Sequence, residues 1–258
     1  SSSQLTYYRT TPKTDIFAMR FLPSFLLLVA TLKCASSFTT PPHSKISLTS
    51  SPSSNLHAVK IEGYDEAFAT IDSCATSGEP SPNLYNAVRF IDKNALQIYP
   101  SLDHKQQLWN DAHGSWKLQL ATGGGKFTEF KPVPIFAFAM IDDLNFGNGV
   151  GLNEGMVLLS LLGPHVYNMQ RRQMVITIDD LFLGANRATE YVPGFIKDGM
   201  GLGKGVDDYV KPQRPPAFTF IGGSEKALIA RGGTGGIAIW TRMERDIRPA
   251  AYGQLSDS

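Results

Sequence analysis

The chain has 258 residues, of which 42% are hydrophobic and 18% are charged, and these values suit one globular domain with a sizeable core. Its formal net charge is +1, but residues 1–58 hold five basic side chains and one acid, which leaves 19 basic and 22 acidic side chains in residues 59–258. A body with this acidic balance is a poor match for polyanions, so we expect no nucleic-acid partner.

The beginning of the chain has the composition of a targeting leader. A basic start at Met19 precedes the apolar run 21–32, which is too short to span a bilayer because that takes ~20 residues. Ala35 and Ser37 then place small side chains where a signal peptidase requires them. We therefore expect a signal peptide over 19–37; a buried helix followed by a loop is the alternative.

The next stretch, 38–58, is rich in Ser and Thr and contains no acid. The junction Ala35-Ser36-Ser37-Phe38 resembles the Ala-Ser-Ala-Phe junction of nuclear-encoded plastid proteins in algae with complex, red-lineage plastids. In such leaders an aromatic residue directly after signal cleavage carries import, and Phe38 holds that position. The resemblance implies a plastid transit segment over 38–58 and a plastid location, in the stroma or at a thylakoid or plastoglobule surface. Residues 1–18 are then an extraneous stretch.

Residues 59–110 have the pattern of a helical preface with two or three short helices. Tyr64, Ala67, Phe68 and Ile71 form one apolar stripe at helical spacing. Two further helical stretches are expected over 84–91, after the start signal Ser81-Pro82, and over 102–109.

Residues 111–248 have the texture of an antiparallel β-domain, and 249–258 form a tail. Short apolar runs with alternating polar residues are separated by Gly, Pro and Asn, which is typical of a sheet with one wet face. About eight strands without βαβ spacing favour a closed barrel or a sandwich. The gap 194–216 is expected to be a long mobile loop. The strands are expected near 115–121, 134–141, 156–162, 166–170, 174–178, 217–221, 227–230 and 237–242.

The sequence matches known phosphate-binding, dinucleotide-binding and metal-binding motifs poorly. The run 123–126 lacks the first glycine and the Ser or Thr of a phosphate loop, and 233–238 precedes a β-type run where a dinucleotide site needs a helix. We expect the aspartate pairs 142/143, 179/180 and 207/208 to be strand-end turn residues. His104, His113 and His165 stand apart from other metal ligands. We therefore expect no catalytic residue, no metal and no resident cofactor, although enzyme activity stays an open question.

One constellation points to a barrel that is closed by an indole. Gly114 and Trp116 open the first strand after the helical preface, and Arg231 and Arg242 lie near the last strands. In small barrels that begin with Gly-x-Trp, a guanidinium from a late strand lies across the indole and contributes ~0.5 to 2 kcal/mol. We assign that guanidinium to Arg231. The alternative is a simple core tryptophan.

Two segments resemble the plastid lipid-associated proteins, also called fibrillins or plastoglobulins. The segment 114–122, GSWKLQLAT, is similar to their opening Gly-x-Trp-x-Leu strand, with Leu120 where Tyr is common. The segment 228–235 is similar to their C-terminal Leu-x-x-x-Arg-Gly-x-x-Gly element, with Leu228 three residues before Arg231 in place of four. The similarity spans about residues 64–243, and these two ends are its specific parts.

The resemblance implies a mainly β, lipocalin-like antiparallel barrel that binds lipid or pigment without catalysis. The implied ligands are a prenyl lipid, a quinone, a carotenoid or a fatty acid. Strand alternation predicts which side chains line the interior, and Arg231 is expected to close the tryptophan end. The predicted ligand-binding residues are Trp116, Leu118, Leu120, Phe136, Phe138 and Arg231.

We further expect the loop 194–216 to contact a plastid membrane peripherally through its basic side chains. These are Lys197, Lys204, Lys211 and Arg214. The alternative function is that of a structural or scaffold β-protein. Such a protein would self-associate through the apolar run 156–162 and the Pro-rich flank 212–216, or dock on a photosynthetic complex.

Overall fold

The structure of the chain is a computed structural model that describes residues 61–123, 129–154, 156–209 and 214–247. The expectations for the signal peptide, for Ala35, Ser37 and Phe38, for the transit segment and for the tail 249–258 fall outside these residues. Lys211 falls outside them as well.

Four helices precede the sheet. They are α2 (Tyr64–Ser77), α3 (Leu84–Lys93), α4 (Ala95–Ile98) and α5 (Leu102–Ala112). The stripe predicted around Phe68 and Ile71 is buried in α2, which ends at Gly78 because that glycine adopts the left-handed conformation. Helix α5 is capped by Ser101, whose hydroxyl accepts the His104 N–H. The start signal at Ser81-Pro82 lies slightly too early, because Asn83 is the residue at the N-cap of α3.

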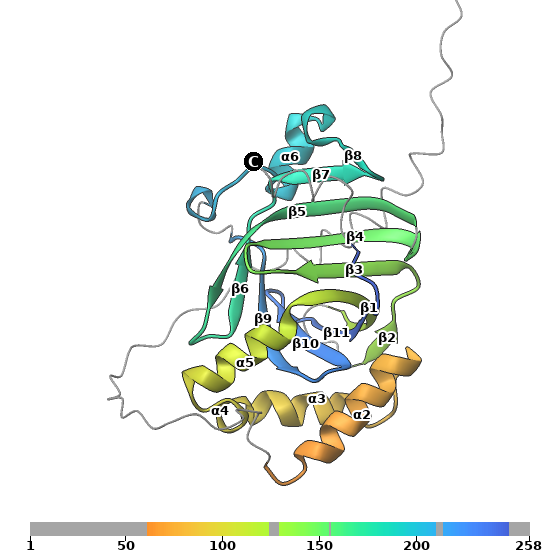
Figure 1. The fold of residues 1–258 in the computed structure, drawn as a ribbon, viewed down its shortest axis with the longest axis vertical. Coiled ribbons are helices and arrows are strands. Elements are labelled where there is room, and N and C mark those ends of the chain that lie inside the picture. Colours follow the sequence, from red (N-terminus) through yellow and green to blue (C-terminus); the bar gives the residue numbers. More distant parts are fainter. Residues whose placement is uncertain (1–60, 124–128, 155, 210–213, 248–258) are drawn as a thin grey trace, which may run out of the picture.

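Antiparallel strands close into a barrel after the helices (Figure 1). In the described part of the chain eight strands form the closed path β1-β3-β4-β5-β6-β9-β10-β11, and β11 pairs back with β1. The short strand β2 adds to β1, and the β7–β8 hairpin adds to β5. The bounds are β1 Gly114–Thr122, β2 Phe130–Pro132, β3 Phe136–Ile141, β4 Asn145–Asn153, β5 Met156–Asn168, β6 Gln173–Ile176, β7 Asp180–Leu183, β8 Asn186–Arg187, β9 Ala217–Gly223, β10 Ala227–Gly232 and β11 Ile237–Arg242.

The predicted fold class, an antiparallel barrel after a few short helices, is confirmed by this pairing. Several strand assignments were wrong in detail. The runs 156–162 and 166–170 form one strand, β5, and the sequence pattern missed β2, β4 and the β7–β8 hairpin. The predicted loop 194–216 contains the helix α6 (Gly194–Met200) and the 3-10 turn η3 (Val206–Asp208).

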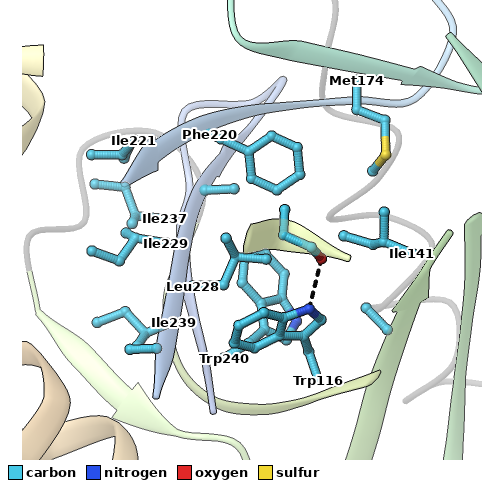
Figure 2. Packing of buried hydrophobic residues seen from close by; sticks show 14 of the residues in the cluster. Trp116, Ile141, Met174, Phe220, Ile221, Leu228, Ile229, Ile237, Ile239 and Trp240 are labelled. Carbon is cyan, nitrogen blue, oxygen red and sulfur yellow. Dashed lines mark hydrogen bonds between the residues drawn. The ribbon is translucent and has the colours of Figure 1, made fainter. Parts of the chain in front are cut away.

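Residues 227–230 of β10 are buried on both faces, and the neighbouring strands β9 and β11 are partly buried (Figure 2). Ile229 and Ile239 project to one side of these strands, and Leu228 and Trp240 project to the other. Helices α2 and α3 contact this sheet region from the outside, so the first side packs against the helices and the second fills the barrel. In Figure 1 the helices α2 to α4 therefore lie at one pole of the molecule, while β7, β8 and α6 lie at the opposite pole.

The aspartate pairs have different environments. Asp142 is a turn residue as predicted, because its carboxylate accepts the N–H groups of Leu144 and Asn145 between β3 and β4. The same prediction was wrong for Asp180, which opens β7 and is buried. Its carboxylate accepts a hydrogen bond from the Arg187 guanidinium at 2.6 Å and thus holds the β7–β8 hairpin together.

Candidate functional site

One end of the barrel is closed by the indole of Trp116 (Figure 2). Trp116 is fully buried, and its Nε1–H donates to the carbonyl oxygen of Ala112 at 2.8 Å, so β1 is joined to the end of α5. The guanidinium of Arg242 lies over the indole, 4.2 Å from the ring centroid. Gly114 has φ of +120°, and a Cβ there would lie 3.0 Å from an Arg242 nitrogen. Glycine is thus needed where the guanidinium crosses the chain.

Arg242, and not Arg231, supplies the stacked guanidinium. Arg242 is the register partner of Trp116, so both side chains project from the same face of the sheet. Arg231 is the partner of Ile237 and lies on the opposite, outward face. There its guanidinium pairs with the Asp92 carboxylate of α3. The prediction that Arg231 closes the tryptophan end was wrong because alternation along β10 turns that side chain towards the helices.

The predicted ligand-binding leucines of β1 lie on opposite faces. Leu118 pairs with Trp240 and faces the interior. The register of β1 against β11 shifts between Leu118 and Leu120. Because a bulge of this kind breaks simple alternation, Leu120 pairs with Ile239 and is buried beneath the helices. The structure therefore places Leu120 outside the barrel interior.

Phe136 and Phe138 project from the outer face of β3. Their register partners on β4 are Gly151 and Gly149, and a Cβ at Gly149 would lie 2.7 Å from the Phe138 ring. The two rings form a separate cluster with Met243 and Ile247. Residues 137–139 border the interior cavity, but its side-chain lining from this strand is Ala137 and Ala139, which alternate with the phenylalanines.

The other end of the interior contains a cavity of about 120 Å³. Small side chains form much of its wall, because alanine stands at four lining positions on β1, β3 and β11. Larger apolar groups surround these alanines, and the Phe218 and Trp240 rings meet edge to face with centroids 5.9 Å apart. The side chains of this lining are those of Leu118, Ala121, Thr122, Ala137, Ala139, Phe146, Asn148, Phe218, Thr234, Ala238 and Trp240. Ile237 also borders the cavity, although its side chain projects to the outer side of β11.

The sequence pattern missed most of this lining. Phe146 and Asn148 belong to β4, where Gly147, Gly149 and Gly151 hide the alternation that marks a strand. A usable signal was present, since glycine at every second position of β4 faces the bulky residues of β3 across the pair. Ala238 and Trp240 lie in a strand that was predicted, but their inward direction depends on the register with β1.

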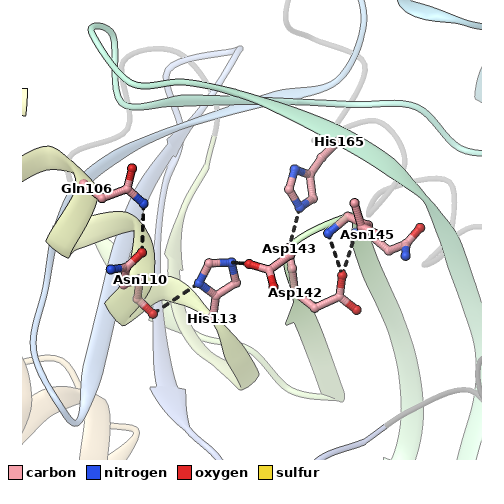
Figure 3. Close-up of polar contacts among 8 residues, drawn as sticks. Gln106, Asn110, His113, Asp142, Asp143, Asn145 and His165 are labelled. Carbon is pink, nitrogen blue, oxygen red and sulfur yellow. Dashed lines mark hydrogen bonds and ion pairs between the residues drawn. The ribbon is translucent and has the colours of Figure 1, made fainter. Parts of the chain in front are cut away.

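A polar cluster that includes His113, Asp143 and His165 lies at the α5 end of the barrel (Figure 3), and Trp109 packs beside it. The indole of Trp109 stacks on Tyr167, with centroids 4.1 Å apart, and meets the rings of His113 and His165 edge to face. His165 Nε2 donates to the Asp142 carbonyl at 2.8 Å, and burial lowers the pKa of this imidazole. These contacts join α5, the β3–β4 turn and β5.

The ionisable groups of this cluster are spread over the end of α5, the β3–β4 turn and β5. His113 Nε2 lies 3.4 Å from the Asp143 carboxylate, which is almost fully exposed. Among the described residues no group of three or more His, Cys, Asp or Glu side chains converges as a metal site. The contacts of Trp109 and His165 form a junction between α5, the β3–β4 turn and β5.

These observations define a class of protein: a closed antiparallel barrel with a helical cover, one end filled by an indole and the other holding an apolar cavity. In the described ranges no helix is long and apolar enough to cross a bilayer.

Known proteins resemble this chain only weakly. No protein-family model and no curated protein matches the chain. Among solved structures, a lipocalin-like protein from Bacteroides uniformis covers 52% of this chain and 99% of its own, at 16% identity and a TM-score of 0.33. An uncharacterized protein from Bacteroides eggerthii covers 51% of this chain and 98% of its own, at 12% identity and the same TM-score of 0.33. The strand pairing of the chain itself carries the assignment of its fold.

Proposed function

We propose that this chain is a non-catalytic binding protein whose barrel holds part of a small apolar lipid or pigment. The observation that carries the proposal is the cavity between Leu118, Phe146, Phe218 and Trp240. A void in a close-packed interior forfeits the dispersion contacts of its lining, so a native cavity in a barrel is a feature that needs an occupant or a reason.

The size of the cavity limits what enters it. Sites for drug-sized ligands span roughly 300–1,000 Å³, and an apolar cavity of about 150 Å³ binds benzene. A space of about 120 Å³ therefore accepts a single ring or the end of a chain. A prenyl lipid, quinone or carotenoid would enter end first and leave the rest of its length outside the barrel.

The test is binding of a short-tailed prenylquinone by the full chain, measured by quenching of tryptophan fluorescence. Ala238→Leu fills the cavity from β11, and Ala185→Leu makes the same change at an exposed turn. We expect saturable quenching in the wild type and in Ala185→Leu, and at least a tenfold weaker affinity in Ala238→Leu. Equal affinity in all three proteins would refute the proposal.

The plastid family resemblance supports a place for this binding at a plastid membrane. Two aromatic side chains near α6 are strongly exposed, Tyr191 at 84% and Phe195 at 78%. Exposed aromatic rings suit the interface between headgroups and acyl chains. Residues 187–209 contain three basic and four acidic side chains. This surface is therefore better matched to neutral lipid headgroups than to anionic ones. We propose that the aromatic pair, more than the basic residues Lys197 and Lys204, makes the membrane contact.

Flotation with neutral phosphatidylcholine vesicles tests this contact. Tyr191→Ser with Phe195→Ser should reduce the floated fraction severalfold, and added salt should have little effect on the wild type. Leu96→Ser is the matched control, because Leu96 is 73% exposed on the helical pole of the molecule. Binding that requires anionic vesicles and disappears with salt would support the basic residues in place of the aromatic pair.

The leader supports delivery to a complex plastid. A fluorescent protein fused behind residues 1–58 should enter the plastid of an alga of the red lineage, and Phe38→Ala should hold it outside the inner envelopes. Import that is unaffected by Phe38→Ala would remove the assigned role of that residue.

The first surface of the scaffold alternative is reduced to its beginning. Residues 159–162 of β5 pair with β4 on one side and with β7 on the other, whereas 156–158 lie outside the register with β7, and Met156 and Leu158 are exposed. Size-exclusion chromatography of the full chain separates the two functions: a discrete small species favours ligand binding, and large assemblies favour a scaffold.

A further inference from the structure

The cavity wall carries one polar side chain in the middle of a strand, Asn148 of β4. Its register partners are Ala139 on β3 and Leu161 on β5, and both of these side chains belong to the main core. Phe146, two residues earlier on the same face of β4, also lines the cavity. The amide of Asn148 is thus set among apolar groups on the inner face of the barrel.

The side chain of Asn148 is half-buried, and it makes no hydrogen bond to another residue that the structure describes. The other polar side chains of the lining differ from it. The Thr122 hydroxyl accepts the Ile237 N–H at 2.9 Å, so it has a structural role. Thr234 lies in the turn between β10 and β11, at the rim of the cavity. Asn148 is therefore the polar group on the wall whose donors and acceptor are open to an occupant.

An amide in apolar surroundings is costly unless something pairs with it. Leaving such a group unsatisfied is unfavourable, so its partner is solvent or a bound molecule. An asparagine offers two N–H donors and one acceptor and carries no charge. None of the described residues that line the cavity is charged. A carboxylate or phosphate would meet no counter-charge there, whereas a carbonyl or hydroxyl oxygen finds a matching donor.

We infer that Asn148 orients the ligand by donating a hydrogen bond to a neutral carbonyl or hydroxyl oxygen at the end that enters the barrel. This inference rests on the proposed function and narrows it. The ligand is an apolar molecule that carries a ketone, quinone or alcohol oxygen at its leading ring or chain end. Free fatty acids entering by their carboxylate and pure hydrocarbons are poorer ligands.

The test uses two probes that share shape and differ in one group, cyclohexanone and methylenecyclohexane. Both are single rings that match a cavity of about 120 Å³. Their affinities for the full chain are measured by ligand-observed NMR titration, in the wild type and in Asn148→Leu. We expect the ratio of ketone affinity to hydrocarbon affinity to be about fivefold to tenfold higher in the wild type than in Asn148→Leu, as one net hydrogen bond contributes. Asn148→Leu should bind the hydrocarbon at least as well as the wild type does.

A second measurement does not depend on the folding of a variant. The side-chain NH₂ resonances of Asn148 in the wild type should shift with cyclohexanone and stay in place with methylenecyclohexane. A ratio of ketone affinity to hydrocarbon affinity that is the same in the wild type and in Asn148→Leu overturns the role of Asn148 and leaves the binding function standing. Absence of binding by both probes overturns the proposed function and this inference together.

Discussion

The two ends of the barrel are built from the same strands, yet one is filled and the other is hollow. At the α5 end, the inward side of β1 carries the fully buried Trp116, and Trp109 stacks on Tyr167 nearby. At the opposite end, the inward positions of β1 and β11 hold Ala121 and Ala238, which are register partners. Strands β1 and β11 pair at both ends of the barrel. The volume of the inward-facing side chains therefore decides at which end a ligand fits.

The largest expected effect on stability comes from removing one aromatic ring from each end of the barrel. Trp116→Ala should lower the free energy of unfolding by about 4 kcal/mol, because it removes a fully buried ring and its hydrogen bond to Ala112. Phe218→Ala should cost about half as much, since Phe218 is partly exposed and borders the cavity. Urea unfolding followed by circular dichroism measures both. Equal losses would show that the two ends are packed alike.

A second test uses two leucines of one strand. Leu120→Ala should cost about 3 kcal/mol, because Leu120 is fully buried between barrel and helices. Leu118→Ala should cost about 1 kcal/mol, since it only enlarges an existing cavity. Ligand affinity should change in the opposite order, with Leu118→Ala altering it and Leu120→Ala leaving it within twofold. If Leu120→Ala altered the affinity more, the bulge would not separate the two faces of β1.

The two arginines sharpen the comparison further. Arg242→Met should lower the free energy of unfolding by about 1–2 kcal/mol, because the Arg242 guanidinium covers Trp116 and donates to the carbonyl oxygens of His113, Asp111 and Glu225. Arg231→Met should cost less than about 1 kcal/mol, because its ion pair with Asp92 is partly exposed. Chemical denaturation of both variants checks the order. The reverse order would restore Arg231 as the arginine that matters for closure.

The smallest expected effect is the pH dependence of the free energy of unfolding that His165 causes at the filled end. Burial lowers the pKa of His165 in the folded protein below its usual 6.5, so the unfolded chain binds this proton more readily. The stabilising effect of neutral His165 is present at pH 7 and is lost progressively as the pH falls below about 6.5. His165→Gln keeps a donor for the Asp142 carbonyl and does not titrate. The difference in unfolding free energy between wild type and variant should therefore decrease from pH 7 to pH 5. A constant difference would contradict the assigned burial.

The sequence predicted the barrel, its helical preface and the importance of Trp116, because periodicity and the Gly114-x-Trp116 spacing are local signals. It did not predict which side chains meet inside. The bulge after Leu118 turned Leu120 outward, and the glycines of β4 concealed a whole strand. Arg231 and Arg242 are both late arginines, and only the register against β1 distinguishes them. Register is a property of two paired strands, so it cannot be predicted from the residue pattern of one strand alone.

The pairing of β1 with β11 also governs how the molecule is made. Trp116 and Arg242 are neighbours across this seam, although nearly half of the chain separates them. Bringing such distant segments together has a high loop-closure entropy, and all-β topologies of this kind fold in milliseconds to seconds. Until the last strand arrives, β1 and β10 keep unpaired edges that attract other chains. We therefore expect that a nascent or translocating chain cannot complete its fold before Arg242 has emerged, and that it needs protection from aggregation until then.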